Sequence, residues 1–459
     1  MFNNMKGMLF YMQKVLLINP EESRTIWTLS GIIDDEPLDL EMIYTELKNN
    51  NIDVLIFDIQ RDAPKKLIQV LEEYNPTITY INGVVKQVPF MKEYNHLIKS
   101  FNSNIKTIVG GNYAEYNYQD FYEEDVDYIV RSYDPNVITE IVNYNSGKKN
   151  DLNALNGLCF KNNDKWITTN IKPVEINDLP IINRDFYYSH QQAFKYLDIK
   201  PVAHIRTAYS CMNKCEFCYR TMLNCGKYTE RTIESVVEEI KNINCENIYI
   251  IDDNFLCNRE RVQKFIKLIK ENDIHKNFIS YGRVDFIVNN EDIIKELKEI
   301  GWLYLLVGIE ASNNYYLGKY NKLISISDSE KCIEMLERIG IRCMGMMIID
   351  LDFTTKDFKN LYSWIKSVGL KRYALSIYTP LPGSILYKKY KDKIIVKDLT
   401  KFDFVHVVAK PTKMSVWRFY LNYYILVIKL FNLANKYGTY DYLDINKWKK
   451  AYTKFLFKH

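Results

Sequence analysis

Short apolar runs alternate with amphipathic stretches in two series along the chain, and this alternation constrains the fold more than any other feature. The first series contains apolar runs with the length of buried strands. Stretches with helical spacing separate these runs, at 40–47 and in KKLIQVLEEY before Pro76. These runs are KVLLIN at 14–19, NIDVLIFDI at 51–59, ITYING at 78–83 and KTIVGG at 106–111. Such alternation is typical of a parallel sheet with helices on both faces. The sequence therefore predicts an α/β fold that begins with a doubly wound parallel sheet.

The second series has six strand-like runs separated by helical stretches: 203–210, 246–255, 278–286, 302–312, 341–350 and 372–383. Six strand–helix units predict a partial (β/α)6 barrel, whose site would lie at the carboxyl ends of the strands. Ligands of a doubly wound sheet also bind beyond the carboxyl ends of its strands. In the first series these ends are Asn19-Pro20, Asp58, Asn82-Gly83 and Gly110-Gly111.

The remaining segments complete a four-part organisation: a sheet domain (1–148), a hairpin and linker (149–200), the barrel (201–390) and a helical C-terminal region (391–459). The hairpin is expected in GLCFKNNDKWITT, with its turn around Asn162-Asn163-Asp164. SVWRFYLNYYILVIKLFNLANKYG predicts a long aromatic helix, which Arg418, Asn422 and Lys429 make too polar to span a bilayer. This helix could pack on the barrel or lie on a membrane surface.

The composition is that of a globular protein. Of the 459 residues, 47% are hydrophobic and 26% are charged, which excludes a disordered or collagen-like chain. A formal net charge of +4 is too small to indicate nucleic acid binding. Nine cysteines with no secretory signal before them favour a reducing cytoplasm. In that compartment, clustered cysteines indicate metal binding or catalysis more often than disulfides.

Three of the cysteines form a compact motif, Cys211-Met-Asn-Lys-Cys215-Glu-Phe-Cys218, directly after the first barrel strand. Thiolates are the ligands of iron–sulfur clusters, and a four-iron cluster held by three cysteines keeps one iron open for chemistry. Two alternatives remain: Cys225 could be a fourth ligand that closes a structural zinc or cluster site, or the cysteines could be unligated. The other cysteines are expected to be small buried apolar residues.

The motif C-x3-C-x2-C, with an aromatic residue before the third cysteine and at the end of a first barrel strand, resembles that of radical S-adenosylmethionine (SAM) enzymes. The resemblance implies that Cys211, Cys215 and Cys218 bind a [4Fe–4S] cluster and that SAM chelates the open iron. Reductive cleavage of SAM then yields a 5′-deoxyadenosyl radical, with electrons from a donor such as flavodoxin or ferredoxin.

The resemblance also implies a SAM site at the other strand ends. Its predicted residues are Phe217, Asp253, Arg283, Glu310 and Ser312. Arg283 could pair with a carboxylate, and Glu310 could accept from an ammonium or hydroxyls. Interior salt bridges are the alternative for these charged residues. The fifth strand departs from the family pattern, because Asp350-Leu-Asp-Phe-Thr-Thr replaces the common Gly and Pro-Gly-Glu-Thr. No residue is assigned as a catalytic acid or hydrogen donor.

The order of sheet domain, hairpin and cysteine barrel is similar to that of cobalamin-binding radical SAM enzymes. DLDFTTKDF, TPLPGS and KFDFVHVVAKPTKM resemble most the branch that includes hopanoid methylases. Cobalamin would lie beyond the carboxyl edge of the sheet, where Gly110 and Gly111 could allow close approach, although a tight turn also explains this pair. Two departures keep an empty, vestigial domain as an alternative. First, the sequence has no Asp-x-His-x-x-Gly motif, and its His96 is predicted to lie inside a helix. Second, Arg131-Ser132-Tyr133-Asp134 stands where the family often has an acidic, glycine-containing turn.

The predicted function is cobalamin-dependent methylation of an unactivated carbon by radical SAM chemistry. Two alternatives are a cobalamin-independent radical cyclisation, rearrangement or epimerisation, and a non-enzymatic four-cysteine metal-binding protein. The substrate could be a small molecule, a lipid or a peptide, and the C-terminal helix could contact a membrane.

Overall fold

The structure is a computed structural model that describes residues 13–22, 33–61, 66–149, 151–163, 165–439 and 441. The chain forms two compact units, and neither is continuous in sequence. The sheet unit comprises Met1–Ser23, Pro37–Ser189 and Leu223–Gly226. The barrel unit comprises Arg24–Glu36, His190–Met222 and Lys227–His459. The predicted four-part boundaries stay a prediction.

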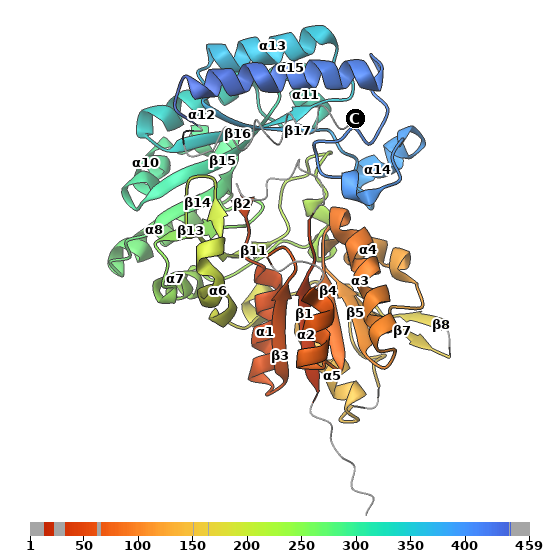
Figure 1. The fold of residues 1–459 in the computed structure, drawn as a ribbon. Helices are drawn as coiled ribbons and strands as arrows, with labels where there is room; N and C mark the ends of the chain where they lie inside the picture. The colour runs from red at the N-terminus through yellow and green to blue at the C-terminus, as the bar shows by residue number, and fades with distance from the viewer. Residues whose placement is uncertain are drawn as a thin grey trace, which may run out of the picture. The chain divides into compact units, whose positions relative to one another are not determined.

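A parallel five-stranded sheet forms the centre of the sheet unit, in the order β3-β1-β4-β5-β6 (Figure 1). Its strands are β1 (Lys14–Asn19), β3 (Asp53–Asp58), β4 (Ile78–Asn82), β5 (Lys106–Gly110) and β6 (Tyr128–Val130). β1 pairs with both β3 and β4, so the strand order reverses between β1 and β4. Such a reversal is the place where doubly wound sheets bind their ligands.

Helices cover both faces of this sheet. They are α1 (Leu38–Asn49), α2 (Lys66–Tyr74), α3 (Val88–Phe101), α4 (Asn112–Asn117) and α5 (Asn136–Asn145). α1 packs with α5, and α2 packs with α3. The doubly wound prediction is confirmed. The predicted hairpin is also confirmed, since β7 (Leu158–Asn162) and β8 (Lys165–Thr168) extend the sheet in antiparallel fashion.

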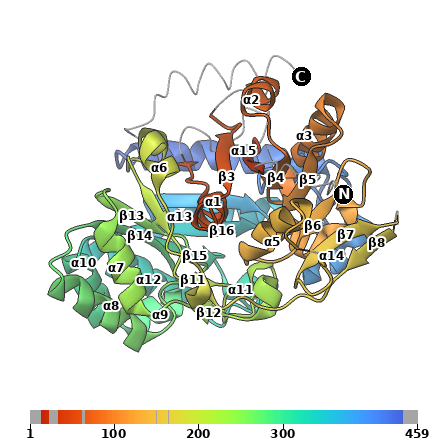
Figure 2. The same ribbon diagram turned by 90° about the horizontal axis from the view of Figure 1, so that it is seen from below.

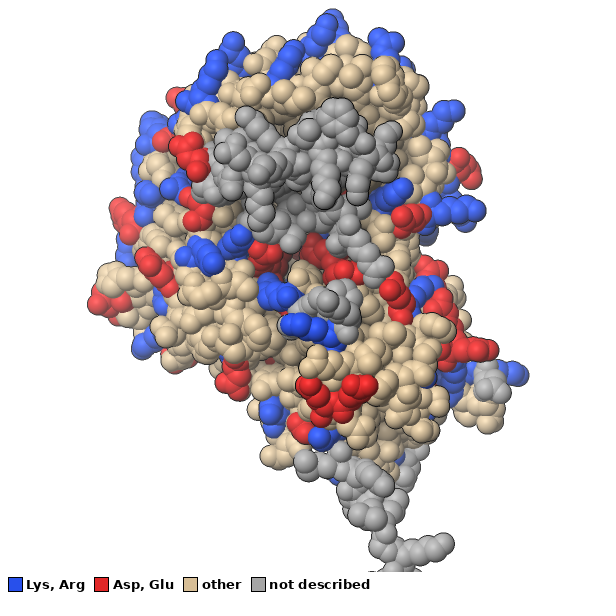
Figure 3. All heavy atoms as spheres, in the orientation of Figure 1, with Lys and Arg blue, Asp and Glu red and all other residues tan. Residues whose placement is uncertain are grey.

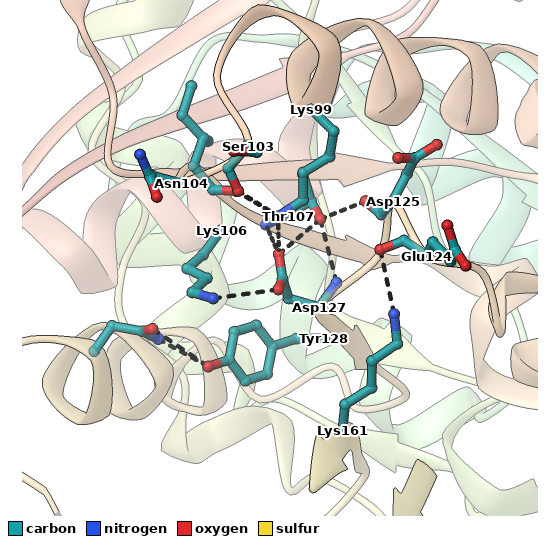
Figure 4. Close-up of polar contacts among 12 residues, drawn as sticks. Lys99, Ser103, Asn104, Lys106, Thr107, Glu124, Asp125, Asp127, Tyr128 and Lys161 are labelled. Atoms are coloured by element: carbon teal, nitrogen blue, oxygen red, sulfur yellow. Dashed lines mark hydrogen bonds and ion pairs between the residues drawn. The ribbon is translucent and has the colours of Figure 1, made fainter. Parts of the chain in front are cut away.

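A polar cluster ties β5 to the turn before β6 and to α3 (Figure 4). Asp127 accepts from Lys99 Nζ at 2.6 Å and from the N–H of Thr107 at 2.9 Å. Lys161 Nζ donates to the carbonyl of Glu123 at 2.7 Å and so joins the hairpin to the same region. The cluster includes Lys106, at the start of β5, so it lies at the amino edge of the sheet and leaves the carboxyl edge to ligands.

Six parallel strands form the sheet of the barrel unit, in the order β10-β13-β14-β15-β16-β17. They are β10 (Ala203–Ile205), β13 (Asn247–Ile250), β14 (Asn277–Gly282), β15 (Trp302–Glu310), β16 (Arg342–Ile349) and β17 (Arg372–Ile377). Within the described chain, no strand pairing joins β10 to β17. The predicted partial (β/α)6 barrel is therefore confirmed as an open one.

The outer layer of this barrel consists of α7 (Ile233–Asn242), α8 (Arg259–Glu271), α10 (Glu291–Glu299), α12 (Ile326–Ile339) and α13 (Thr355–Ser367) (Figure 2). Their apolar faces pack inward. Trp302 is fully buried and stacks on Phe278 and Phe255, with ring centroids 5.2 and 5.6 Å apart. The helical tail is confirmed as α15 (Val416–Asn435), which packs on α13.

Several predicted strands are shorter than expected. The runs 246–255 and 372–383 are reduced to β13 and β17, and two further runs change as follows. The run 203–210 divides into β10 and β11 (Ala208–Tyr209), and β11 pairs antiparallel with β12 (Thr229–Glu230). β14 ends at Gly282, so Arg283 precedes helix α9 (Val284–Asn289) instead of lying in a strand. Both corrections move polar residues from strands into the loops at the carboxyl edge of the barrel.

Candidate active site

The three predicted cluster ligands lie in the loop after β11, and a buried carboxylate holds the start of this loop. Asp252 Oδ1 accepts the N–H groups of Thr207 at 2.6 Å and Ala208 at 3.1 Å, and Oδ2 accepts the Thr207 hydroxyl. Burial raises the pKa of Asp252 to about 6, although these donors oppose the rise. Asp252 therefore places the chain that leads to Cys211, a role that the sequence did not indicate.

Polar groups surround the cysteines, which are free and partly buried. Arg283 Nη1 is 3.6 Å from Cys215 Sγ, and Asn213 Nδ2 is 3.6 Å from Cys211 Sγ. Burial raises the pKa of the Cys218 thiol to about 12. This thiol would lose its proton on binding a metal, because metal coordination deprotonates thiols. The donor set fits an iron–sulfur cluster, with an arginine cation beside one of its sulfurs.

The described residues contain no group of three or more His, Cys, Asp and Glu side chains placed to hold one metal ion. A cluster does not require such convergence, since each cysteine would bind a different iron. Cys225, the alternative fourth ligand, is exposed and lies in Leu223–Gly226, which belongs to the sheet unit. Cys211, Cys215 and Cys218 all belong to the barrel unit.

A buried ion pair closes the carboxyl end of β15. Lys322 Nζ donates to Glu310 Oε1 at 2.8 Å, and the two side chains are 6% and 10% exposed. A Cβ at Gly308 would lie 2.5 Å from this Glu310 oxygen and 2.6 Å from the Lys322 nitrogen. A side chain at 308 would therefore force the charged ends of the pair to shift. The sequence indicated Glu310 but not Lys322, which lies in a loop with no periodic pattern.

Arg283 connects this ion pair to the cysteine loop. Its guanidinium pairs with Asp285 at 2.9 Å and donates to the carbonyl of Lys322 at 3.4 Å. Burial opposes the charge, but Asp285 and Cys215 outweigh it and raise the pKa of Arg283. The structure thus brings Arg283, Glu310 and Cys215 close together, and their roles in binding SAM and the cluster stay predictions.

The other predicted SAM residues have different surroundings. Asp253 Oδ1 pairs with Arg220 at 3.3 Å and is mostly buried. The Phe217 ring contacts the edge of Tyr320, with ring centroids 5.6 Å apart. Ser312 is partly buried just after β15. The interior salt bridges that were the alternative reading do form, between Asp253 and Arg220 and between Glu310 and Lys322.

A second polar cluster lies where the fifth strand departs from the family pattern. The fully buried Asp350 accepts Lys319 Nζ at 2.8 Å and the Tyr320 hydroxyl at 2.7 Å. Lys319 also donates to Asp352 at 2.6 Å. Tyr320 stacks on Tyr378 at 6.1 Å, just after β17. This cluster therefore joins the ends of the fifth and sixth strands to Phe217, and only its two aspartates were noticed in the sequence.

At the carboxyl edge of the sheet unit, the predicted strand ends do lie together. Asn19 Nδ2 donates to Asp58 Oδ1 at 3.2 Å, and Gln87 Nε2 donates to the carbonyl of Pro20 at 3.0 Å. Burial raises the pKa of Asp58, against the effect of Arg61. The edge at the strand reversal thus includes the amides of Asn19 and Gln87, backbone groups and the Asp58–Arg61 ion pair, all of which can hydrogen-bond to the amide-rich rim of a corrin.

The packing of the sheet unit itself explains the Gly110-Gly111 pair. A Cβ at Gly110 would lie 2.2 Å from the Tyr80 hydroxyl. Gly111 has φ +94°, and a Cβ there would lie 2.1 Å from Asn82 Oδ1. A role for the two glycines in cobalamin binding stays a prediction. His96 lies in α3 as predicted and pairs with Asp125 at 2.9 Å.

The segment Arg131-Ser132-Tyr133-Asp134 lies beside a buried carboxylate that the sequence did not indicate. The Arg131 guanidinium stacks on Tyr118 at 4.0 Å, and Tyr133 donates to Asn112 at 2.8 Å. Arg131 Nε also donates to the carbonyl of Glu115, and burial raises the pKa of the Glu115 carboxyl. The chain after β6 therefore surrounds α4 with polar contacts of its own.

Family comparisons agree with both units. The family model of the radical SAM superfamily matches residues 205–365, and that of the B12 binding domain matches residues 34–142. The hopanoid C-3 methylase of Methylococcus capsulatus is 22% identical over 394 residues, covering 84% of this chain and 74% of its own. The anaerobic magnesium-protoporphyrin IX monomethyl ester cyclase of Rubrivivax gelatinosus is 24% identical over 375 residues, covering 79% of this chain and 67% of its own.

Among solved structures, the cobalamin-dependent S-adenosylmethionine radical enzyme OxsB with aqua-cobalamin and SAM bound matches with a TM-score of 0.71 and 14% identity. The match covers 90% of this chain and 66% of the OxsB chain, so this chain spans just under two thirds of OxsB, and the likeness shows the fold. The matched B12 binding domain does not support an empty N-terminal domain, and a radical SAM domain overturns the alternative of a non-enzymatic metal-binding protein. Radical SAM and B12 binding domains are thus both present in this chain, which is a radical SAM enzyme with a [4Fe–4S] cluster, SAM and cobalamin as its cofactors.

Proposed function

We propose that this enzyme transfers a methyl group from SAM, by way of cobalamin, to an unactivated carbon of a small organic substrate. When bound, the cluster supplies the electron that cleaves SAM to a carbon radical, and the cobalamin supplies the methyl group. The observation that carries the proposal is the web of Arg283, Lys322 and Glu310 beside the Cys215 thiol at the carboxyl edge of the barrel.

In this proposal, Cys211, Cys215 and Cys218 hold the cluster. Asp252 supports this role because it fixes the backbone of Thr207 and Ala208 just before the loop. Partial burial of Cys218 limits the access of water to its sulfur, and low solvent access strengthens electrostatic interactions within a metal site. The Arg283 cation would offset part of the negative charge of the thiolates and sulfides.

The same web would bind SAM. SAM carries an ammonium and a carboxylate, and the web offers both a carboxylate and two cations. Glu310 would accept from the SAM ammonium or from its ribose hydroxyls, while Arg283 or Lys322 would pair with the SAM carboxylate. Phe217, Asp253 and Ser312 are proposed as further contacts, with Phe217 offering an aromatic surface next to the cluster loop.

Anaerobic reconstitution with iron, sulfide and cobalamin tests this proposal. The expected protein binds both iron and cobalt, cleaves SAM to 5′-deoxyadenosine under reduction, and moves label from the SAM methyl group into an extracted product. Cys211→Ala, Cys215→Ala and Cys218→Ala should each lose most of the iron, whereas the matched control Cys225→Ala should keep it. Loss of iron in Cys225→Ala would instead indicate a closed four-cysteine site. Absence of cobalt binding would overturn the methyl transfer.

A radical reaction without methyl transfer is the second candidate, because one of the relatives is named a cyclase. Deuterium transfer from substrate into 5′-deoxyadenosine, with no label from the SAM methyl group in the product, would favour it. In both cases the enzyme needs a one-electron donor such as flavodoxin or ferredoxin. Nine free thiols fit a reducing compartment such as the cytoplasm, which is the proposed location.

A further inference from the structure

Helix α15 has two apolar faces on opposite sides. One face packs inward, and its buried residues recur at helical spacing: Phe419, Tyr423, Leu426, Leu430 and Leu433. The other face has an apolar stripe with the same spacing, formed by Trp417 (73% exposed), Leu421 (44%), Ile425 (45%) and Ile428 (49%). Exposed stripes of large apolar side chains are rare on soluble surfaces and indicate an interaction site.

The segment of the sequence that carries this stripe has charges of one sign. Between Asp403 and Asp441 the sequence contains no acidic residue. The same stretch contains five basic residues, and all are exposed: Lys410, Lys413, Arg418, Lys429 and Lys436. On helical geometry, Arg418, Lys429 and Lys436 follow one flank of the stripe. Long basic side chains beside an apolar face can reach an interface with their charged ends.

The neighbouring helix α13 also exposes basic side chains. α13 exposes Lys356, Lys359 and Lys366, and its acidic residue Asp357 is engaged by Thr354 at the start of the helix. Figure 3 shows basic side chains along the upper rim of the molecule, where Figure 1 draws α13 and α15. Exposed basic side chains of both helices therefore surround the apolar stripe.

We propose that α15 binds the surface of an anionic lipid bilayer, with the apolar stripe in the boundary between headgroups and acyl chains. The basic residues would then contact lipid phosphates. A second copy of the chain is a poorer occupant, since a symmetric contact through this face would bring the same cations together. No described helix is long and apolar enough to cross a bilayer, so the helix would lie in the plane of the surface. This inference depends on no step of the proposed reaction.

Flotation of the full-length protein with lipid vesicles tests the inference. Binding is expected to vesicles that contain about a third phosphatidylglycerol, and much less to pure phosphatidylcholine, because the surface potential of anionic lipids attracts basic segments. The double variant Leu421→Glu with Ile425→Glu should weaken binding at least about tenfold, because two apolar side chains lose their burial. The triple variant Lys413→Gln, Arg418→Gln, Lys436→Gln should weaken binding to anionic vesicles and reduce its salt dependence.

Two controls keep the result interpretable. Ile181→Glu changes another exposed apolar side chain, 62% exposed, in the sheet unit, and should leave vesicle binding unchanged. The thermal midpoint of the Leu421/Ile425 variant should equal that of the parent protein, since both side chains are exposed. Equal binding of parent and variant to anionic vesicles would overturn the inference. So would a parent dimer in sedimentation velocity that becomes a monomer in the same variant, because a second copy would then cover the stripe.

Discussion

The buried carboxylate of Glu115 accepts the backbone N–H of Cys225 at 3.1 Å. Asn224, Cys225 and Gly226 have φ values of 55°, 57° and 73°, so three successive residues have left-handed backbone. Successive N–H groups in such a turn form a concave site for an anion. Asn224 also exchanges hydrogen bonds with Val174 at 2.7 and 3.1 Å. The segment Leu223–Gly226 is thereby held in the sheet unit, although it follows the cysteine loop in sequence.

Glu115→Ala is expected to release this segment. Cys225 is exposed, so its N–H can turn to water, and loss of the hydrogen bond should cost about 0.5–1.5 kcal/mol and make local opening roughly 2- to 10-fold more frequent. Limited trypsin digestion at Lys227, monitored by mass spectrometry, would detect the change. Glu115→Gln keeps a hydrogen-bond acceptor, so trypsin should cleave this variant more slowly than Glu115→Ala. The remote control Glu140→Ala should be cleaved at the rate of the parent protein. Equal cleavage rates for all variants would show that Glu115 does not hold the segment.

The sequence predicted those parts of the structure that depend on local pattern. The apolar runs of β1, β4 and β15 predicted their strands because a buried parallel strand needs continuous apolar residues. The cysteine motif is equally local, since three ligands lie within eight residues. Arg283 was placed in a strand because its neighbours are apolar, whereas the structure ends β14 one residue earlier.

Contacts between residues distant in sequence could not be predicted. Glu115 and Cys225 are 110 positions apart, and Thr207 and Asp252 are 45 apart. Lys322 is adjacent to Glu310 only because the chain after α11 (Asn314–Lys319) turns back to the end of β15. A lone lysine in a loop is usually solvated, so its residue type gave no signal. The same holds for Tyr320, one of many tyrosines in the chain.

Gly308→Ala is expected to disturb the Glu310–Lys322 pair. The new methyl group would lie 2.5 and 2.6 Å from the two charged groups, so one of them must move. Because both side chains are buried, a displaced and unpaired charge is costly, and the SAM dissociation constant should rise at least about tenfold, equivalent to about 1.4 kcal/mol. Isothermal titration of the anaerobically reconstituted protein would measure it.

Gly318→Ala is the matched control for this change. Gly318 lies in α11, and a Cβ there would have no neighbour within 4 Å. Alanine also favours a helix by about 0.5–1 kcal/mol relative to glycine, so stability should stay equal or rise. If both alanine variants bound SAM with the affinity of the parent, the ion pair would not belong to the SAM site.

Asp127→Asn is expected to reduce stability in a way that depends on pH. Burial of Asp127 is outweighed by Lys99, Thr107 and Lys106, which lower its pKa below the ordinary value of 3.8. The ionised form therefore stabilises the fold above that value, and the stabilisation is lost as pH falls through the lower folded pKa. Loss of charge-assisted hydrogen bonds should cost about 1.5–3 kcal/mol at neutral pH. Urea unfolding of parent and variant should differ at pH 7, and the difference should shrink as pH falls below 3.8; a constant difference would contradict the assignment.

Asp252→Asn should show the opposite dependence. Burial raises the pKa of Asp252 from 3.8 to about 6, so between these values the folded protein keeps a proton that the unfolded chain releases. The stabilisation from this group is therefore fully present below about pH 4 and is lost as pH rises to about 6. The lost free energy of unfolding is up to about 3 kcal/mol, at 1.36 kcal/mol per pKa unit. Asparagine has no such titration and can still accept the N–H groups of Thr207 and Ala208 through its amide oxygen. Urea unfolding of the metal-free protein from pH 4 to pH 7 should thus show the variant gaining stability relative to the parent as pH rises. Parallel curves would mean that Asp252 is ionised throughout this range in the folded protein.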